Sequence, residues 1–301
     1  MDHDEFMVRV WGVRGSYPVP GPTTLEFGGN TSCVEVRVGG HLIILDAGTG
    51  IIGLGRELAR RGEPVVATLL FSHTHHDHTQ GFPFFDPAYN ATTVLYMFGP
   101  RDFDRDLEEA LARAMLAPAF PIALGDMRSL QLISNFSDES EIIILEESQH
   151  SKVSNIHHDN RNFSPDAVQI SLLRSYAHPN SGVNIYCIIW KEQKLVYATD
   201  TESYVGGDAR LIAFAQDADL LIHDAQYTED EYVSASGSKQ GWGHSTARMA
   251  LTTAKQAGVK RLAMFHYDPQ HEDGMLSQLE REVQRKFPNA VFAREGMVIT
   301  L

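Results

Sequence analysis

The chain of 301 residues is 43% hydrophobic, which is enough apolar material for a sizeable core and indicates a globular protein. It carries 25 Lys and Arg residues against 39 Asp and Glu residues, a formal charge of −14, and it lacks the basic stripe that nucleic-acid-binding proteins usually show. No long apolar run and no export signal occurs, so we expect a cytoplasmic protein without a membrane partner.

The first half of the chain is rich in short apolar runs typical of strands. These runs are residues 6–12, 33–40, 41–48 and 64–72, with Gly-rich turns between them. Helical periodicity appears at residues 51–62 and 101–116, and strand-like runs return at 130–136 and 141–147. The order predicts a sheet-rich α/β fold with helices interspersed.

The second half repeats this theme of strands followed by helices. Residues 168–176 predict a strand, and residues 183–201 predict a hairpin whose polar KEQK tip forms the turn. Helices are predicted at 209–216, 245–258 and 276–287, and strands at 218–225, 260–267 and 290–301.

One polar segment interrupts the pattern. Residues 149–166 lack any apolar period, so they predict a long loop or flexible insertion. The segment contains His157 and His158, which we interpret as solvated loop histidines because metal ligands need rigid supports.

The strongest signal is the stretch SHTHHDHT at residues 72–79, which follows the apolar strand-like run. In an extended continuation of that strand His73 and His75 face the same side, while His76 points away. The turn that follows brings Asp77 and His78 to a second position. Imidazole nitrogen and carboxylate oxygen are ligands that Zn²⁺ and similar ions prefer, so the stretch predicts a metal site.

This stretch resembles the HxHxDH motif of the metallo-β-lactamase superfamily, and the segments LDAGTG, SYAHPNSG, YATDTES and AMFHYDP are similar to that family's other motifs in the same order. The resemblance implies one domain over residues 1–301, an αββα sandwich of two packed mixed β-sheets flanked by helices. It also implies a centre of two divalent metal ions. One ion would be held by His73, His75 and His178, the other by Asp77, His78 and His266, with Asp200 bridging and with Asp46 and His223 supporting the ligands from behind.

The C-terminal third narrows the resemblance. Aspartate at position 200, rather than cysteine, argues against antibiotic hydrolysis, and the HST segment at His244 is similar to that of the tRNase Z and phosphodiesterase branch. The HDAQ segment departs slightly from that branch's HEAT segment. In the implied mechanism a metal-bridged hydroxide, oriented by Asp77, attacks phosphorus, and His244 supported by Asp224 protonates the leaving oxygen. The GHSTA sequence also reads as a helix N-cap, and both readings can hold together.

The expected substrate is a small 3′,5′-cyclic nucleotide, because the chain is acidic and lacks the long Gly- and Pro-bearing arm of tRNase Z. Asn30, Thr31 and Ser32 either offer donors to phosphate or sugar at a pocket mouth or simply supply turn chemistry, and both readings stay open. The alternatives are a tRNase Z-like 3′ endoribonuclease acting on RNA, a thioesterase or lactonase, and a non-catalytic metal-containing sensor. Zn²⁺ is the expected ion, with Mn²⁺ as the alternative, and the resemblance implies a homodimer.

Overall fold

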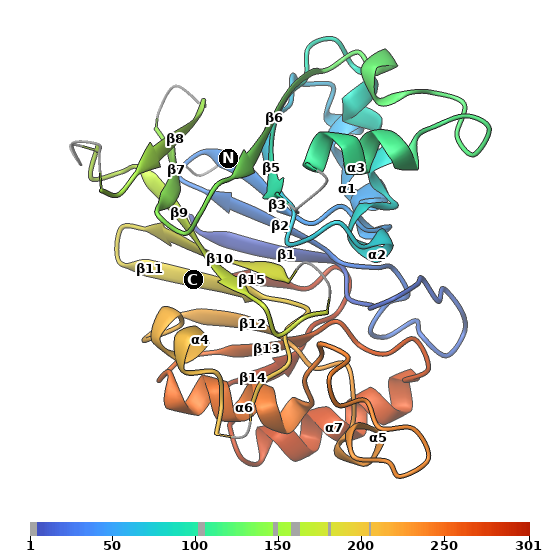
Figure 1. Ribbon diagram of the computed structural model, residues 1–301, viewed down its shortest axis with the longest axis vertical. Helices are drawn as coiled ribbons and strands as arrows, with labels where there is room; N and C mark the ends of the chain where they lie inside the picture. Colours follow the sequence, from blue (N-terminus) through green and yellow to red (C-terminus); the bar gives the residue numbers. More distant parts are fainter. Residues whose placement is uncertain (1–4, 102–105, 147–149, 158–162, 180–181, 205) are drawn as a thin grey trace.

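Two β-sheets pack face to face in a computed structural model that describes residues 5–101, 106–146, 150–157, 163–179, 182–204 and 206–301 (Figure 1). The first sheet contains β1 (Met7–Gly12), β2 (Cys33–Val38), β3 (His41–Leu45), β4 (Val66–Leu70), β5 (Val94–Pro100), β6 (Leu130–Phe136) and β15 (Val298–Thr300). The second contains β7 (Glu141–Leu145), β8 (Ser151–Asn155), β9 (Val168–Ser175), β10 (Val183–Trp190), β11 (Gln193–Ala198), β12 (Leu220–Asp224), β13 (Leu262–Phe265) and β14 (Ala290–Phe292).

Both sheets mix parallel and antiparallel pairs. Their orders are β15-β1-β2-β3-β4-β5-β6 and β14-β13-β12-β11-β10-β9-β7-β8. In the first sheet β3, β4, β5 and β6 run parallel, and in the second β11 to β14 do so. The termini of the described chain meet in the first sheet, where β15 pairs with β1.

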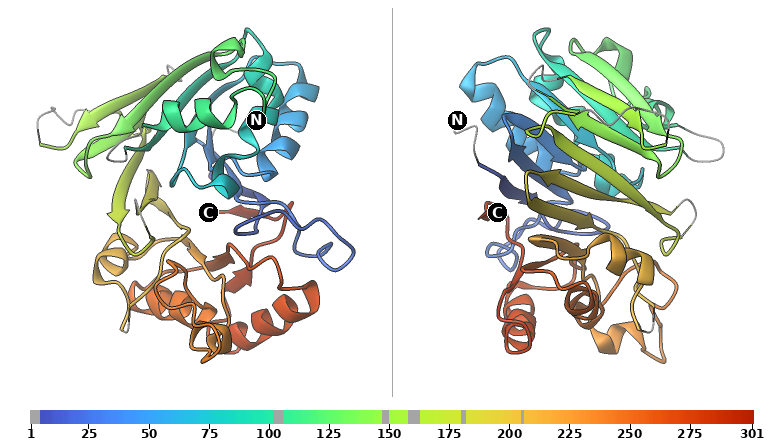
Figure 2. Two further views of the ribbon diagram at one scale, coloured as in Figure 1. Left: turned by 45° about the vertical axis from the view of Figure 1, so that its right-hand side comes forward. Right: turned by 90° about the vertical axis from the view of Figure 1, so that its left-hand side faces the viewer.

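Helices cover the outer faces of both sheets (Figure 2). The longer helices are α1 (Gly50–Arg61), α3 (Leu107–Ala114), α4 (Ala209–Phe214), α6 (Ala247–Gln256) and α7 (Asp273–Gln284), and short turns form α2 (His76–Thr79), α5 (Glu229–Tyr232), η1 (Phe82–Phe84), η2 (Asp86–Tyr89) and η3 (Leu124–Asp126). In α1 the spacing of Ile51, Leu54 and Leu58 gives one buried apolar stripe, which packs on the first sheet. The expected αββα sandwich is confirmed.

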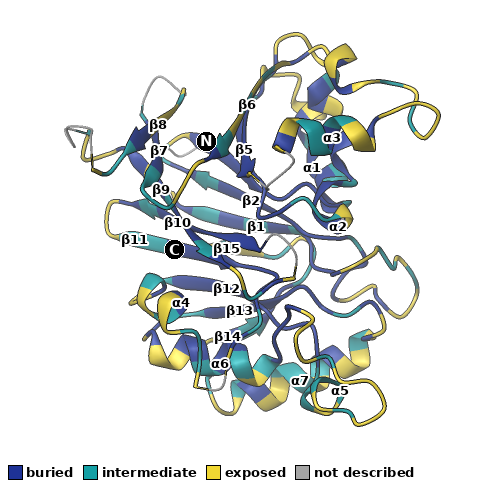
Figure 3. Ribbon diagram, in the orientation of Figure 1, coloured by how far each residue is buried: buried dark blue, intermediate teal, exposed yellow. Residues whose placement is uncertain are grey.

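The main core lies between the sheets. Along β1 the side chains of Val8 and Val10 are buried while Met7 and Arg9 are partly exposed, which is the period of two that a strand imposes. One continuous apolar cluster joins Val36 and other residues of the first sheet to residues of the second. In Figure 3 the strands in the middle of both sheets are accordingly buried, and most exposed residues lie on the helices, the loops and edge strands such as β6 and β8.

Two strands were not predicted. The strand β5 lies between β4 and β6 in the first sheet, and β8 falls inside residues 149–166, which we expected to form a loop. That expectation is wrong for Ser151–Asn155, which pairs antiparallel with β7 at the edge of the sheet. An edge strand needs backbone partners on one side alone, and its other side tolerates polar residues, so no apolar period marks it.

The structure describes one of the two histidines of this segment. His157 is exposed in a turn, as expected for a solvated loop histidine, and His158 lies outside the described residues. A single domain over residues 1–301 stays a prediction. Within the described ranges, every helix is too short or too polar to cross a bilayer.

Candidate metal centre

The expected metal-binding residues lie where parallel strands of the two sheets end. Leu45 at the end of β3 pairs with Leu70 at the end of β4, which brings Asp46 beside the segment that begins at Ser72. In the second sheet Asp224 pairs with Phe265, directly before His266. Because parallel strands present their carboxyl ends at one edge, side chains remote in the sequence meet there.

The backbone turns sharply at three of these positions. Asp46, Asp200 and His266 have φ values of 59°, 50° and 63°, although none is glycine. Aspartate and histidine adopt this left-handed conformation more often than other side chains, but it is still strained and persists only where tertiary contacts hold it. Each of the three lies within two residues of a strand end. Strain at three converging positions is typical of a functional site.

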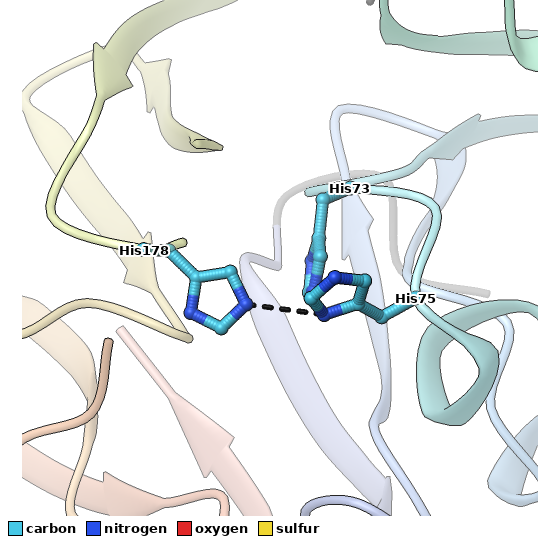
Figure 4. A group of neighbouring side chains, drawn as sticks. All are labelled: His73, His75 and His178. Carbon is cyan, nitrogen blue, oxygen red and sulfur yellow. Dashed lines mark hydrogen bonds between the residues drawn. The ribbon is translucent and has the colours of Figure 1, made fainter. Parts of the chain in front are cut away.

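The first donor group consists of His73, His75 and His178. Figure 4 shows His178 facing His75 across the space between their loops, with the Nε2 and Nδ1 atoms 3.1 Å apart. The rings of His73 and His75 lie 4.3 Å apart between centroids, so these two residues share a side as predicted. The Nε2 atom of His73 is buried and has no hydrogen-bond partner in the described part of the chain. The group therefore offers converging ring nitrogens that could hold a metal ion.

The second donor group consists of Asp77, His78, Asp200 and His266, all of them buried. The Nε2 atom of His78 lies 3.1 Å from Asp200 Oδ2 and 3.3 Å from the Nε2 atom of His266. The short helix α2 directs Asp77 and His78 into this group and leaves His76 exposed, as the spacing predicts.

Asp200 lies between the two groups. Its Oδ1 atom is 3.7 Å from His73 Nε2 and 4.0 Å from His178 Nε2, while its Oδ2 atom faces His78. One carboxylate therefore presents one oxygen to each donor group, which is the arrangement that a bridging ligand requires.

Asp46 lies behind the second group. Its Oδ2 atom accepts hydrogen bonds from His78 Nδ1 at 2.8 Å and from the Tyr197 hydroxyl at 2.8 Å, and its Oδ1 atom accepts one from the Ser72 amide at 2.7 Å. Asp46 thus fixes the ring of His78 from the side opposite to the group. The sequence analysis missed Ser72 and Tyr197. Ser72 heads the histidine stretch, but nothing distinguishes Tyr197 from other apolar strand residues.

His244 and Asp224 form a buried pair beside both groups. The Nδ1 atom of His244 lies 2.7 Å from Asp224 Oδ2, and the His244 ring stacks on that of His266 with centroids 5.1 Å apart. The other Asp224 oxygen accepts the Ser245 amide at 2.8 Å, which holds the carboxylate in place. Thr246 caps α6 through its hydroxyl, so the N-cap interpretation is confirmed alongside the pairing.

His223 occupies a different place from the one expected. Its neighbour Asp224 faces His244, and successive strand side chains point to opposite faces. The His223 Nδ1 atom bonds the carbonyl oxygen of Asp224 at 2.7 Å. Its support of the site therefore runs through the Asp224 backbone and not through a donor side chain.

Of the two interpretations of Asn30, Thr31 and Ser32, burial contradicts the pocket mouth for Thr31 and Ser32, while for the partly exposed Asn30 it stays a prediction. Thr31 and Ser32 are fully buried, and the Thr31 hydroxyl accepts the Thr49 amide at 2.8 Å. The Asn30 side-chain amide donates to Glu295 at 2.9 Å. The side chains of Asn30 and Thr31 thus hold the β1–β2 connection against its neighbours, in agreement with the alternative interpretation as turn chemistry.

The pKa shifts of the donor residues favour the binding of cations. Burial lowers the pKa of His73 well below its usual value and that of His178 to about 4, so both rings are neutral and offer lone pairs at pH 7. Burial by itself would raise the pKa of Asp77, but the neighbouring His78 holds it well below the usual range. Burial likewise opposes a charge on His78, yet the Asp200 carboxylate raises its pKa well above the usual value. The second group therefore attracts positive charge.

Comparison with known proteins identifies the family of the chain. The family described as the beta-lactamase superfamily domain matches residues 41–267. A ribonuclease Z of Gemmatimonas aurantiaca is 25% identical over 332 aligned residues, which cover 98% of this chain and 96% of the relative.

Solved structures show the same fold. The metallo-beta-lactamase fold protein YhfI from Bacillus subtilis aligns with a TM-score of 0.66 at 19% identity, covering 99% of this chain and 100% of that protein. The short form of human tRNase Z aligns with a TM-score of 0.62 at 20% identity, covering 97% and 98%. Since the family match spans most of the chain and the sandwich is shared, the protein belongs to the beta-lactamase superfamily.

Proposed function

We propose that the chain is a metal-dependent phosphodiesterase that cleaves RNA in the manner of a ribonuclease Z. The observation that carries this proposal is Asp200, whose two oxygens face two adjacent donor groups, with the His244–Asp224 pair packed against both. The ribonuclease Z that aligns with 98% of the chain supports RNA as the substrate. RNA therefore replaces the cyclic nucleotide as the preferred substrate.

The donor groups fit divalent ions. The ring nitrogens of His78 and His266 approach to 3.3 Å, and lone pairs aimed at one point repel each other unless a proton or a metal ion lies between them. The buried carboxylates Asp77 and Asp200 supply the compensating negative charge. A mixed nitrogen and oxygen set suits Zn²⁺, with Mn²⁺ as the alternative.

The proposed ligands form two sets, one for each metal ion, with one residue shared between them. His73, His75 and His178 would hold one ion, Asp77, His78 and His266 the other, and Asp200 would contact both. Two divalent ions bound there would lower the pKa of water and neutralise the charge that builds up on a phosphoryl group.

Side chains of the protein would carry out the proton transfer and orient the attacking water. Asp224 holds His244 through Nδ1, so the other ring nitrogen is free to give a proton to the oxygen that leaves phosphorus. The ring acts as an acid in its doubly protonated form: the Nδ1 proton stays on the hydrogen bond to Asp224, the Nε2 proton transfers, and the ring ends neutral. The Asp77 carboxylate, fixed by the Ser16 amide at 2.7 Å, orients the attacking water.

A small cyclic nucleotide is the second candidate, and the charge of −14 favours it. Affinity for RNA rests largely on Lys and Arg contacts with phosphates, whereas a small diester needs a few pocket groups. The homodimer and the cytoplasmic location stay predictions.

A side-by-side hydrolysis assay tests the proposal. The metal-loaded protein is given a 3′-extended precursor tRNA and a panel of 3′,5′-cyclic nucleotides, with the Asp200→Ala variant as the control for contaminating nucleases. We expect cleavage of the tRNA at its 3′ side. Turnover of cyclic nucleotides alone would favour the second candidate, and turnover of thioesters or lactones without either phosphodiester would overturn the proposal.

A further inference from the structure

We infer that exposed aromatic side chains beside the metal centre stack the nucleobase next to the scissile phosphodiester, an inference that rests on the proposed function. These side chains, which we call the aromatic rim, are Tyr176, Tyr204 and Trp242, and they are 75%, 60% and 54% exposed. Large aromatic rings usually contribute to cores or interfaces, so several in solvent around one site suggest a surface that binds a flat partner.

Each rim residue lies on a loop that also carries a site residue. Tyr176 precedes His178 by two positions, and Trp242 precedes His244 by two. Tyr204 follows Asp200 on the third loop. The rim is therefore attached to the same backbone segments that position the donor groups.

Hydrogen bonds join these loops into one unit. The His178 ring donates from Nδ1 to the Gly243 carbonyl oxygen at 3.2 Å, which connects the Tyr176 loop to the Trp242 loop. The Glu202 carboxylate accepts the amides of Gly241 at 2.8 Å and Gly243 at 2.9 Å, which connects the Tyr204 loop to the same segment.

The approach of these loops is close enough to require a glycine. Gly243 has a φ of +88°, and a Cβ atom there would lie 2.4 Å from His178 Nδ1. The spacing between rim and metal centre is thus set by the fold.

Cationic side chains accompany the rings. The Lys239 Nζ atom lies 3.9 Å from the centre of the Trp242 ring and 5.5 Å from that of Tyr227, whose ring in turn packs against His244. The Arg174 guanidinium lies 6.0 Å from the Tyr176 ring.

Aromatic rings beside cations, on a protein of charge −14, match a ligand that carries both a flat base and a negative backbone. An apolar protein partner would gain nothing from the cations. The occupant is therefore a nucleotide whose phosphate lies at the metal centre and whose base stacks on the rim, whether it belongs to RNA or to a free cyclic nucleotide.

Ligand titration tests the rim without requiring turnover. The metal-loaded protein is titrated with adenosine monophosphate and with ribose 5-phosphate, which lacks the base. Binding is measured by calorimetry, and the quenching of tryptophan fluorescence, to which Trp11 and Trp190 also contribute, is followed in parallel. We expect adenosine monophosphate to bind about tenfold more tightly, because stacking one base on an aromatic ring has a free energy of about 1–3 kcal/mol, which corresponds to roughly 5- to 160-fold in affinity.

Matched variants assign the effect. Trp242→Ala should lose most of the preference for the base, Trp242→Phe should keep most of it, and Leu132→Ala, which shortens an exposed apolar side chain on β6, should bind as the wild type does. Equal binding of the two ligands to the wild type, or an unchanged preference in Trp242→Ala, would overturn the inference.

Kinetics separate this inference from the proposed function. A short RNA and its counterpart with an abasic nucleotide beside the scissile bond, and a cyclic nucleotide in parallel, are compared as substrates. For whichever diester is cleaved, Trp242→Ala should raise KM about tenfold with a smaller change in kcat. Base-dependent binding without cleavage of either diester would support base stacking on the aromatic rim and contradict the phosphodiesterase proposal. Equal cleavage of the abasic and intact RNA would support the phosphodiesterase proposal and contradict base stacking on the aromatic rim.

Discussion

His244 and Asp200 lie near each other in the site, yet their substitution should separate catalysis from metal binding. His244→Ala removes the proton donor held by Asp224 and leaves both donor groups intact, so turnover should fall by about 10²–10⁴-fold at unchanged metal content. Asp200→Ala removes the carboxylate that faces both groups and should lose metal. Steady-state kinetics together with elemental analysis of the purified variants measure the two effects. Wild-type turnover by His244→Ala would refute the assignment of the general acid.

At this residue scale the members of the two donor groups left a clearer signal in the sequence than Ser72 and Tyr197, which hold them in place. The histidine stretch packs His73 to His78 within one turn and strand end, so short spacing alone indicated their convergence. Tyr197, by contrast, reaches Asp46 across 151 positions of sequence, and its neighbours are equally apolar. The partner of the Asn30 side-chain amide, Glu295, is likewise 265 positions away, so the sequence did not reveal it. Long-range contacts of this kind have no local signature.

The helix α6 begins next to His244, and its cap can be tested by itself. The Thr246 hydroxyl accepts the Met249 amide at 3.3 Å, so Thr246→Ala should lower the free energy of unfolding by about 1 kcal/mol. Thr252→Ala, at a partly exposed position of the same helix, is the matched control and should leave stability unchanged or slightly raised, because alanine is the better helix former. Urea denaturation monitored by circular dichroism measures both variants. Equal stability of the two would mean that the cap contributes nothing.

The secondary-structure prediction fails for strands that tertiary contacts define and that show no local hydrophobic periodicity. Strands such as β1 alternate buried and partly exposed side chains, and helices such as α1 carry an apolar stripe, so local periodicity revealed them. The strand β5 is a short, almost wholly buried run that carries no alternation. The strand β8 is polar because it lies at an edge, and only its pairing with β7 defines it.

On the scale of the whole molecule, Arg294 ties the C-terminal segment to α7 and to the loop after β1. Its guanidinium donates to Glu280 at 2.6 Å and to Glu26 at 3.2 Å. Burial alone would raise the pKa of Glu280, but the hydrogen bond from Arg294 lowers it below its ordinary value of 4.5. A lowered folded-state pKa means that this carboxylate stabilises the protein above about pH 4.5, and the contribution disappears as the pH falls through the lower folded-state value.

Glu280→Gln should therefore lower stability near neutral pH and have little effect in acid. The expected loss at pH 7 is about 1 kcal/mol, a modest figure because the pair is partly exposed and screened by solvent. Glu282→Gln, on the exposed face of the same helix, is the control and should follow the wild type at every pH. Urea midpoints collected between pH 7 and pH 3 measure the difference. A gap between Glu280→Gln and wild type that persists at low pH would contradict the assignment.

The donor groups also connect the two sheets, since His73 to His78 follow β4 of the first sheet while His178, Asp200 and His266 follow strands of the second. Removing metal should leave the buried carboxylates Asp77 and Asp200 with the neighbouring histidines alone to balance their charge, and loosen this junction. A ligand at 100 times its Kd stabilises the folded state by about 2.7 kcal/mol, so chelation should lower Tm by several degrees.

Differential scanning calorimetry before and after chelation, with Zn²⁺ or Mn²⁺ restored in a third sample, measures the shift and its reversal. Asp200→Ala should begin at the lower Tm and respond little to the chelator, because its site no longer retains metal. An equal Tm for metal-loaded and metal-free wild type would show that the ions do not hold the sheets together.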